Sequence, residues 1–259
     1  MNPYRAYSPC TPAGCVRHGV PPVPASVTAR RVAALVRALG GGGPLPVRAA
    51  DVLAALGVTI DVTGVAGAAP APALSEPGPV GTLIVANHRS WLDIVGLLAI
   101  EPVAFLAKRE VESWPWVSSI ASRHGTVFVD RWALRTLPEA VAAVADRLRS
   151  GRSVVVFPEA TTFCSDKGGR FRPAAFQAAL DAGAPIRPVS LSYRQCGRES
   201  TVPAFVGDDT LARSMARVLR ADDLSLRVRL HPALEPVGDR RELACQAQRA
   251  VTSGERVDV

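Results

Sequence analysis

From residue 80 onward, short apolar runs alternate along the chain with longer segments of helical periodicity. The apolar runs have the length and the Val, Ile and Leu content of buried strands, and they cover 80–86, 103–107, 126–130, 153–157, 185–193 and 224–230. The segments between and after them predict helices over 91–100, 137–149, 173–182, 209–220 and 240–251. This alternation predicts an α/β sandwich, a largely parallel sheet flanked by helices. Functional side chains of such sheets gather at the carboxyl ends of the strands.

The N-terminal part of the chain predicts a basic helical extension to this sandwich. Residues 1–50 contain six arginines and no acidic residue. Four apolar residues at helical spacing define one face of a helix that ends at Gly40: Val32, Leu35, Val36 and Leu39. Because Arg30, Arg31 and Arg37 lie off that face, the helix has two interpretations. It packs on the protein's own core, or it lies in a membrane interface.

The chain is predicted to divide into three parts. Residues 1–65 form the basic extension, which also contains a second helix at 47–56 and a strand at 58–64. Residues 66–79 are rich in Ala, Pro and Gly and are interpreted as a linker. Residues 80–252 form the main domain.

The charge of the chain narrows its possible partners. The formal net charge is +7, and 28 of the 30 basic residues are arginine, since Lys108 and Lys167 are the only lysines. Such a surface suits phosphate or an anionic membrane. An aromatic content of 5% and the lack of any nucleic-acid-binding motif argue against nucleic acid as a partner. No apolar run reaches the roughly 20 residues that span a bilayer, and the start of the chain lacks the order of a signal peptide. We therefore expect a peripheral or monotopic protein on the cytoplasmic face.

The cysteines are odd in number and scattered along the chain. They are Cys10, Cys15, Cys164, Cys196 and Cys245. This pattern indicates neither a disulfide framework nor a paired C-x-x-C zinc site. The sequence therefore predicts reduced thiols.

The clearest chemical signal follows the first strand of the main domain, in the turn NHRSWLD at 87–93. His88 precedes Asp93 by five residues, which on one continuous helix turn about 500° and would point the side chains apart. They can meet if His88 lies on the turn and Asp93 in the first helical turn, with Ser90 as N-cap. A histidine held by a carboxylate is a general base with a fixed tautomer. The alternative is a capping box with an incidental histidine.

Two other kinds of catalytic site are disfavoured. No G-x-S-x-G elbow accompanies the turn, and no second histidine stands nearby as in H-E-x-x-H. The pair therefore favours a His–Asp dyad that acts on a substrate hydroxyl over a covalent serine enzyme or a zinc site.

Further polar residues follow the other predicted strands and are candidates for binding a substrate. They are Lys108, Arg131, Glu159, Thr161, Thr162, Arg170 and Arg172. Taken singly, each basic residue is typical of a solvated surface. Their shared position at successive strand ends is what favours contact with an anion.

Taken together, these blocks resemble the glycerolipid acyltransferase family, whose best-known member acylates 1-acylglycerol 3-phosphate. The family's four motifs are matched in order between residues 80 and 193, by NHRSWLD, GTVFVDR, FPEATT and APIRPVSL. A Lys-x-Glu segment with a following Pro and aromatic residue is matched by AKREVESWPW. Any one of these motifs is weak, but four in the family's order are specific.

The resemblance implies transfer of a fatty acyl chain from acyl-CoA or acyl carrier protein to the free hydroxyl of 1-acyl-sn-glycerol 3-phosphate, which gives phosphatidate. It implies no cofactor, no metal and no covalent acyl-enzyme. By motif position, His88 would be the base and Asp93 its orienting partner. Arg131 would bind the acceptor's phosphate, and Glu159 and Thr161 would shape the acceptor pocket. The family's frequent N-terminal membrane segment also implies contact with an anionic membrane.

Departures from the family pattern leave the acceptor open. Ala160 stands for the usual Gly of the third motif, Thr162 for the usual Arg, and Arg172-Pro173 for the common Lys-Gly. Loss of the motif arginine removes a bidentate phosphate donor, which Arg170 or Arg172 would have to replace. Lyso-ornithine lipid, which carries no phosphate, or another lysolipid is the alternative acceptor. A thioesterase, and a non-catalytic membrane-binding protein with the same fold, are the alternatives in function.

Overall fold

In the computed structural model of the protein, the described residues are 7–64, 73–108, 126–129, 136–165 and 168–253. Their helices are α1 (Pro12–Cys15), α2 (Ala25–Gly40), α3 (Leu45–Leu56), α4 (Leu92–Ile100), α6 (Leu137–Arg149), α7 (Ala174–Ala182), α8 (Leu211–Arg220) and α9 (Arg240–Ser253). The strands are β1 (Val58–Thr63), β2 (Leu83–Ala86), β3 (Ala104–Lys108), β4 (Val127–Val129), β5 (Val154–Val156), β6 (Ile186–Gln195), β7 (Arg198–Glu199) and β8 (Leu224–Leu230). Each strand and helix predicted for the main domain has its counterpart here.

The strands form one sheet in the order β1-β8-β6-β2-β5-β3-β4, with β7 paired to β6 outside this path. Strands β6, β2, β5, β3 and β4 are parallel to their neighbours in this series. Strand β8 runs antiparallel to β6 and carries β1 in parallel on its other edge. The predicted largely parallel α/β sandwich is therefore confirmed, and its edge is of the mixed type common in such folds.

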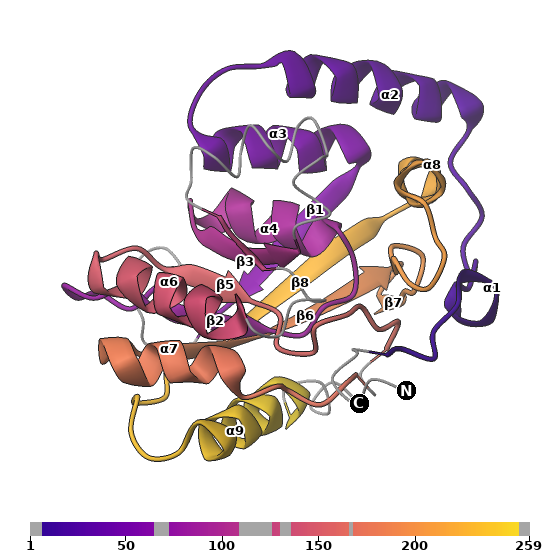
Figure 1. Ribbon diagram of the computed structural model, residues 1–259. Coiled ribbons are helices and arrows are strands. Elements are labelled where there is room, and N and C mark those ends of the chain that lie inside the picture. The colour runs from indigo at the N-terminus through magenta and orange to yellow at the C-terminus, as the bar shows by residue number, and fades with distance from the viewer. Residues whose placement is uncertain (1–6, 65–72, 109–125, 130–135, 166–167, 254–259) are drawn as a thin grey trace.

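Helices cover both faces of the sheet (Figure 1), with α3 and α4 on one face and α7 and α9 on the other. Strand β2 shows why the predicted strands read as unbroken apolar runs. Ile84 and Ala86 belong to the core on the α4 side, while Leu83 and Val85 belong to the core on the α7 side. All four side chains are fully buried, as expected for a central strand covered on both faces.

The N-terminal extension is joined to the main domain through the sheet and the core. Strand β1 pairs with β8 from Val58 to Thr63. Helix α3 packs against α4, and α2 packs against α3 (Figure 1). Leu35 of α2 belongs to the same buried cluster as residues of β2 and β6. No helix in the described part of the chain is long and apolar enough to cross a membrane.

Candidate active site

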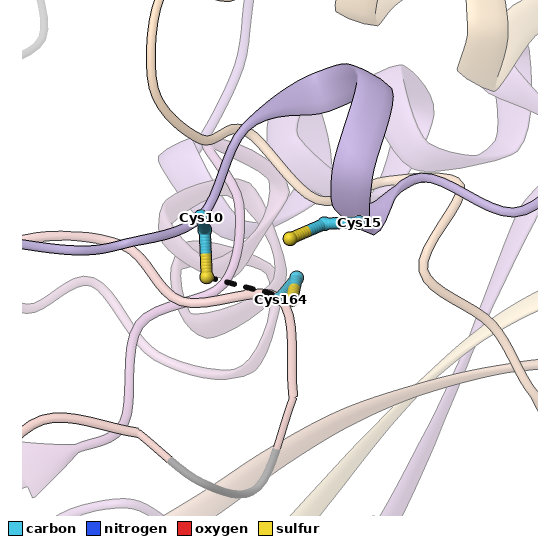
Figure 2. A group of neighbouring side chains, drawn as sticks. All are labelled: Cys10, Cys15 and Cys164. Atoms are coloured by element: carbon cyan, nitrogen blue, oxygen red, sulfur yellow. Dashed lines mark hydrogen bonds between the residues drawn. The ribbon is translucent and has the colours of Figure 1, made fainter.

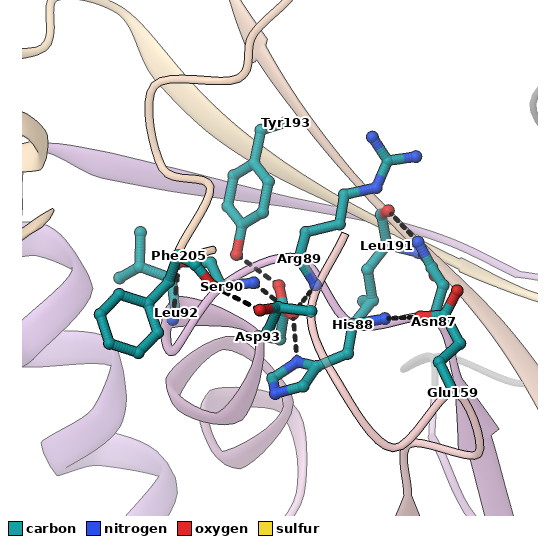
Figure 3. A network of polar contacts seen from close by, with 11 residues as sticks. Asn87, His88, Arg89, Ser90, Leu92, Asp93, Glu159, Leu191, Tyr193 and Phe205 are labelled. Atoms are coloured by element: carbon teal, nitrogen blue, oxygen red, sulfur yellow. Dashed lines mark hydrogen bonds and ion pairs between the residues drawn. The ribbon is translucent and has the colours of Figure 1, made fainter. Parts of the chain in front are cut away.

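The turn between β2 and α4 brings His88 and Asp93 into contact (Figure 3). Strand β2 ends at Ala86 and α4 begins at Leu92, so His88 lies on the turn and Asp93 in the first helical turn. His88 Nδ1 lies 2.8 Å from Asp93 Oδ2. The geometry required of the dyad is therefore present. The capping contacts predicted for Ser90 are present, since its amide donates to Asp93 Oδ2 at 2.8 Å and its hydroxyl accepts from the amide of Leu92 at 3.3 Å, although Trp91 is the residue directly before the helix.

Asp93 is fully buried and accepts several hydrogen bonds from its surroundings. Besides His88, the amides of Arg89 and Ser90 donate to its Oδ2 at 2.7 and 2.8 Å. The hydroxyl of Tyr193 on β6 donates to its Oδ1 at 2.6 Å (Figure 3). Burial, and secondarily the charge of Asp93, raise the pKa of Tyr193 well above its usual value, so this hydroxyl stays a donor. Several donors on both oxygens offset the cost of burying a carboxylate.

The hydrogen bond to Asp93 fixes the tautomer of His88. An ionised carboxylate only accepts, so Nδ1 of the neutral ring carries the proton and Nε2 carries the lone pair. The ring stacks on Phe157, with centroids 3.9 Å apart and planes 12° from parallel. Its side chain is 18% exposed, which leaves the ring open to a substrate on one side. The arrangement suits a base that takes a proton through Nε2.

Glu159 supports the same turn from the loop after β5. It is 5% exposed, and its Oε2 accepts from the amide of His88 at 2.8 Å. Burial raises the pKa of Glu159 to about 8, against the opposing effect of backbone hydrogen bonds from His88 and Gly169. A Cβ added at Gly168 would lie 2.0 Å from Glu159 Oε1, so a side chain there would displace the Glu159 carboxyl group.

Glu159→Gln is expected to flatten the pH dependence of stability. The folded protein holds the Glu159 proton up to a pH of about 8, whereas the unfolded chain releases it near the ordinary value of 4.5. The folded state therefore binds more protons in this window, and the stability of the wild type falls as the pH rises through it. Glutamine mimics the protonated form and does not titrate. Urea unfolding at several pH values should show that the free energy of unfolding of the variant rises relative to that of the wild type between pH 5 and 8. A difference in free energy that stays constant with pH would contradict the raised pKa of Glu159.

The rest of the third motif holds the site through its backbone conformation and through hydrogen bonds to neighbouring loops. Ala160 has a φ of 62°, in the left-handed region that favours glycine, where the family pattern has one. Thr162 Oγ1 donates to the carbonyl of Phe205 at 2.5 Å, and the amide of Phe163 donates to the carbonyl of His88 at 2.9 Å. The hydroxyl of Thr162 is thus engaged within the protein, while Thr161 is half-buried beside it.

The other predicted binding residues are placed less fully. Arg131 lies outside the described residues, and Lys108 is described only as the last residue of β3. Arg170 is exposed, whereas Arg172 is half-buried and its amide donates to the carbonyl of Pro158 at 3.0 Å. A small pocket beside the turn is lined by Asn87, His88, Arg89, Glu159, Phe163, Ser165, Gly168, Gly169, Phe171, Gln248, Val251 and Thr252. His88, Asp93 and Glu159 are therefore brought together, and the predicted arginines are not shown to join them.

Two supporting residues were missed from the sequence. Phe157 belongs to the third motif but offers no polar group, and only the fold stacks it on His88. Tyr193 lies 100 residues after Asp93. Its signal was a tyrosine within an otherwise apolar strand, because a buried hydroxyl needs a hydrogen-bond partner.

Comparison with known proteins places these features in context. A family model described as Acyltransferase matches residues 74–192. Lyso-ornithine lipid O-acyltransferase from Pseudomonas aeruginosa is 39% identical over 175 residues, which cover 65% of this chain and 66% of that protein. 1-acyl-sn-glycerol-3-phosphate acyltransferase from Neisseria meningitidis serogroup B is 36% identical over 178 residues, covering 68% of this chain and 66% of that protein. The match thus spans about two thirds of the length of these relatives.

The fold has a counterpart among solved structures. The crystal structure of PlsC, the 1-acyl-sn-glycerophosphate acyltransferase of Thermotoga maritima, superposes with a TM-score of 0.59. The similarity covers 88% of this chain and 93% of that one, at 20% sequence identity. At this identity the comparison concerns the fold.

Proposed function

This chain belongs to the glycerolipid acyltransferase family, and on that premise we propose that it transfers a fatty acyl chain from a thioester to the free hydroxyl of a lysolipid. The observation that carries the proposal is the hydrogen bond of 2.8 Å between His88 Nδ1 and Asp93 Oδ2. This hydrogen bond leaves Nε2 of His88 as a base. The site around it is formed by the turn after β2 and the loop after β5.

In the proposed reaction, Nε2 of His88 takes the proton of the acceptor hydroxyl as the hydroxyl oxygen attacks the thioester carbonyl. The carbon–sulfur bond then breaks, and the departing thiol takes the proton back from the imidazolium. Asp93 stabilises that imidazolium while it exists. A thioester is activated enough that these proton transfers suffice, and the proposal includes no cofactor.

The first candidate acceptor is 1-acyl-sn-glycerol 3-phosphate, with acyl-CoA or acyl carrier protein as the donor. It is supported by the family's commonest activity and by relatives that carry its name. Lyso-ornithine lipid is the second candidate, and one observation favours it. Thr162 stands where the family has an arginine, and its hydroxyl is bonded to Phe205, so this position presents no charge to a phosphate.

A product assay tests the proposal. The full chain is incubated with a labelled acyl-CoA or acyl carrier protein and with either lysolipid or no acceptor, and the products are identified by mass. We expect an acylated lysolipid that forms only when an acceptor is present. Release of free fatty acid at the same rate without acceptor would identify a thioesterase instead.

The same proposal requires contact with a lipid surface, and α2 offers one. Three residues of its apolar stripe are exposed, with Val32 at 44%, Val36 at 66% and Leu39 at 46%. Leu35 instead packs into the core. Packing on the protein therefore accounts for Leu35, and contact with a membrane would account for the three exposed residues. Arg31 is no longer available to a membrane, because its guanidinium donates to the carbonyls of Leu219 and Ala221. Arg30 and Arg37 remain exposed, and each contributes about 1 kcal/mol near an anionic surface.

Val36→Glu is expected to weaken binding to anionic vesicles by 10-fold or more in a flotation assay. Burying a valine is worth about 1.5–3 kcal/mol, and the new carboxylate adds repulsion. Val237→Glu is the matched control, because Val237 is 69% exposed on the loop before α9. The control should float like the wild type. Equal losses in both variants, or none in Val36→Glu, would place the membrane contact elsewhere.

A further inference from the structure

Three of the scattered cysteines meet in the folded protein (Figure 2). Cys10 lies just before the short helix α1, and Cys15 is the last residue of that helix. Cys164 lies on the loop after β5. Their Sγ atoms all lie within 4.8 Å of one another, and those of Cys10 and Cys164 are 3.5 Å apart. Cys10 and Cys164 are separated by 154 residues, which is why the sequence pattern showed no cluster.

The local structure holds these thiols in place. The hydroxyl of Thr11 accepts from the amide of Gly14 at 3.1 Å and caps α1, whose single turn brings Cys15 back toward Cys10. A Cβ at Gly207 would lie 2.9 Å from the carbonyl oxygen of Cys10, so this segment rests closely on the 201–210 loop. The amide of Arg17 donates to Thr201 Oγ1 on the same loop at 2.9 Å.

The arrangement suits a metal ion better than a disulfide. Zinc binds thiolates at about 2.3 Å in a tetrahedron, which sets its sulfur atoms about 3.8 Å apart. The Cys10–Cys164 separation of 3.5 Å lies close to this value and all three separations are within 4.8 Å, so a small side-chain adjustment would form a three-thiolate site. A disulfide would use only two sulfur atoms and would leave the convergence of the third without a role. All three side chains are half-buried, which keeps them reachable by an ion.

We propose that Cys10, Cys15 and Cys164 bind Zn²⁺ as thiolates, with the fourth position taken by water or a small ligand. The ion would attach the N-terminal segment to the loop that supports the dyad. Cys164 directly follows Phe163, whose amide bonds the carbonyl of His88. We therefore assign the site a structural role at the edge of the active centre, outside the acyl-transfer steps themselves.

Metal analysis of the full chain tests this proposal. After equilibration of the reduced protein with one equivalent of Zn²⁺ and gel filtration, we expect one zinc per chain. Cobalt in place of zinc should give the thiolate-to-cobalt charge-transfer absorption. Single Cys→Ser changes at each of the three positions should reduce both signals. Cys196→Ser and Cys245→Ser are matched controls at exposed positions and should retain them.

A second measurement avoids any dependence on how the variants fold. In the wild type, zinc should slow alkylation of Cys10, Cys15 and Cys164 by at least 10-fold and leave Cys196 and Cys245 unchanged, as read by peptide mass. It should also raise the melting temperature, since a ligand of the folded state stabilises it. Protein that stays metal-free, or equal protection of all five thiols, would overturn the proposal. So would a Cys10–Cys164 disulfide that forms in preference to metal binding.

Discussion

Replacing His88 with alanine is expected to lower turnover by roughly 10²–10⁴-fold, the usual contribution of a positioned general base. The acceptor hydroxyl would have to attack without transferring its proton to Nε2. The fold should survive, because the backbone contacts of this residue do not involve the ring. The amide of His88 still donates to Glu159, and its carbonyl still accepts from Phe163. The turnover number at saturating acceptor and the melting temperature together separate the two effects.

A matched histidine keeps this result interpretable. His18 is exposed on the N-terminal segment, and His18→Ala should leave turnover within about twofold of the wild type. Turnover of His88→Ala close to the wild type, on an acceptor that the wild type uses, would rule out His88 as the base. An equal loss in both variants would point to a general effect of removing a histidine rather than to the dyad.

The features that the sequence predicts are those set by residues close together in the chain. Strands such as 153–157 read correctly because a strand buried on both faces is apolar throughout. The His88–Asp93 contact was predictable because only one turn separates the two residues. The antiparallel direction of β8 was not, since a strand bounded by loops carries no mark of its direction in its own residues.

The unpredicted parts of the site depend on packing between distant segments. Tyr193 reaches Asp93 only because β6 pairs beside β2 in the sheet. The three-thiol cluster exists because α1 rests against the loop after β5, and no spacing within either segment records that contact. Ala160 shows a different limit. An alanine stands where the family has a glycine, which predicts a change in the backbone. The backbone nevertheless keeps the left-handed conformation, at a cost of about 1–2 kcal/mol.

The second large effect is expected at Asp93, where asparagine should also lower turnover by roughly 10²–10⁴-fold. If the amide oxygen replaces Oδ2, it still accepts from His88 and the two backbone amides, but no charge remains to stabilise the imidazolium. If the amide is reversed, its NH₂ group faces three donors and the histidine loses its orientation. Either way the proton transfer to Nε2 is impaired. Steady-state turnover and unfolding should be measured together.

Tyr193→Phe provides the graded comparison, because it removes one neutral donor to Oδ1 and leaves the carboxylate charged. A hydrogen bond to a charged group contributes about 1.5–3 kcal/mol to stability, but the charge of Asp93 and its contact with His88 remain, so turnover should fall less than in Asp93→Asn. His88→Ala combined with Asp93→Asn should be no slower than His88→Ala alone, because Asp93 acts only through the histidine. Additive losses in the double variant would show that Asp93 contributes to the reaction independently. Turnover of Asp93→Asn above that of Tyr193→Phe would mean that the charge of Asp93 has no part in catalysis.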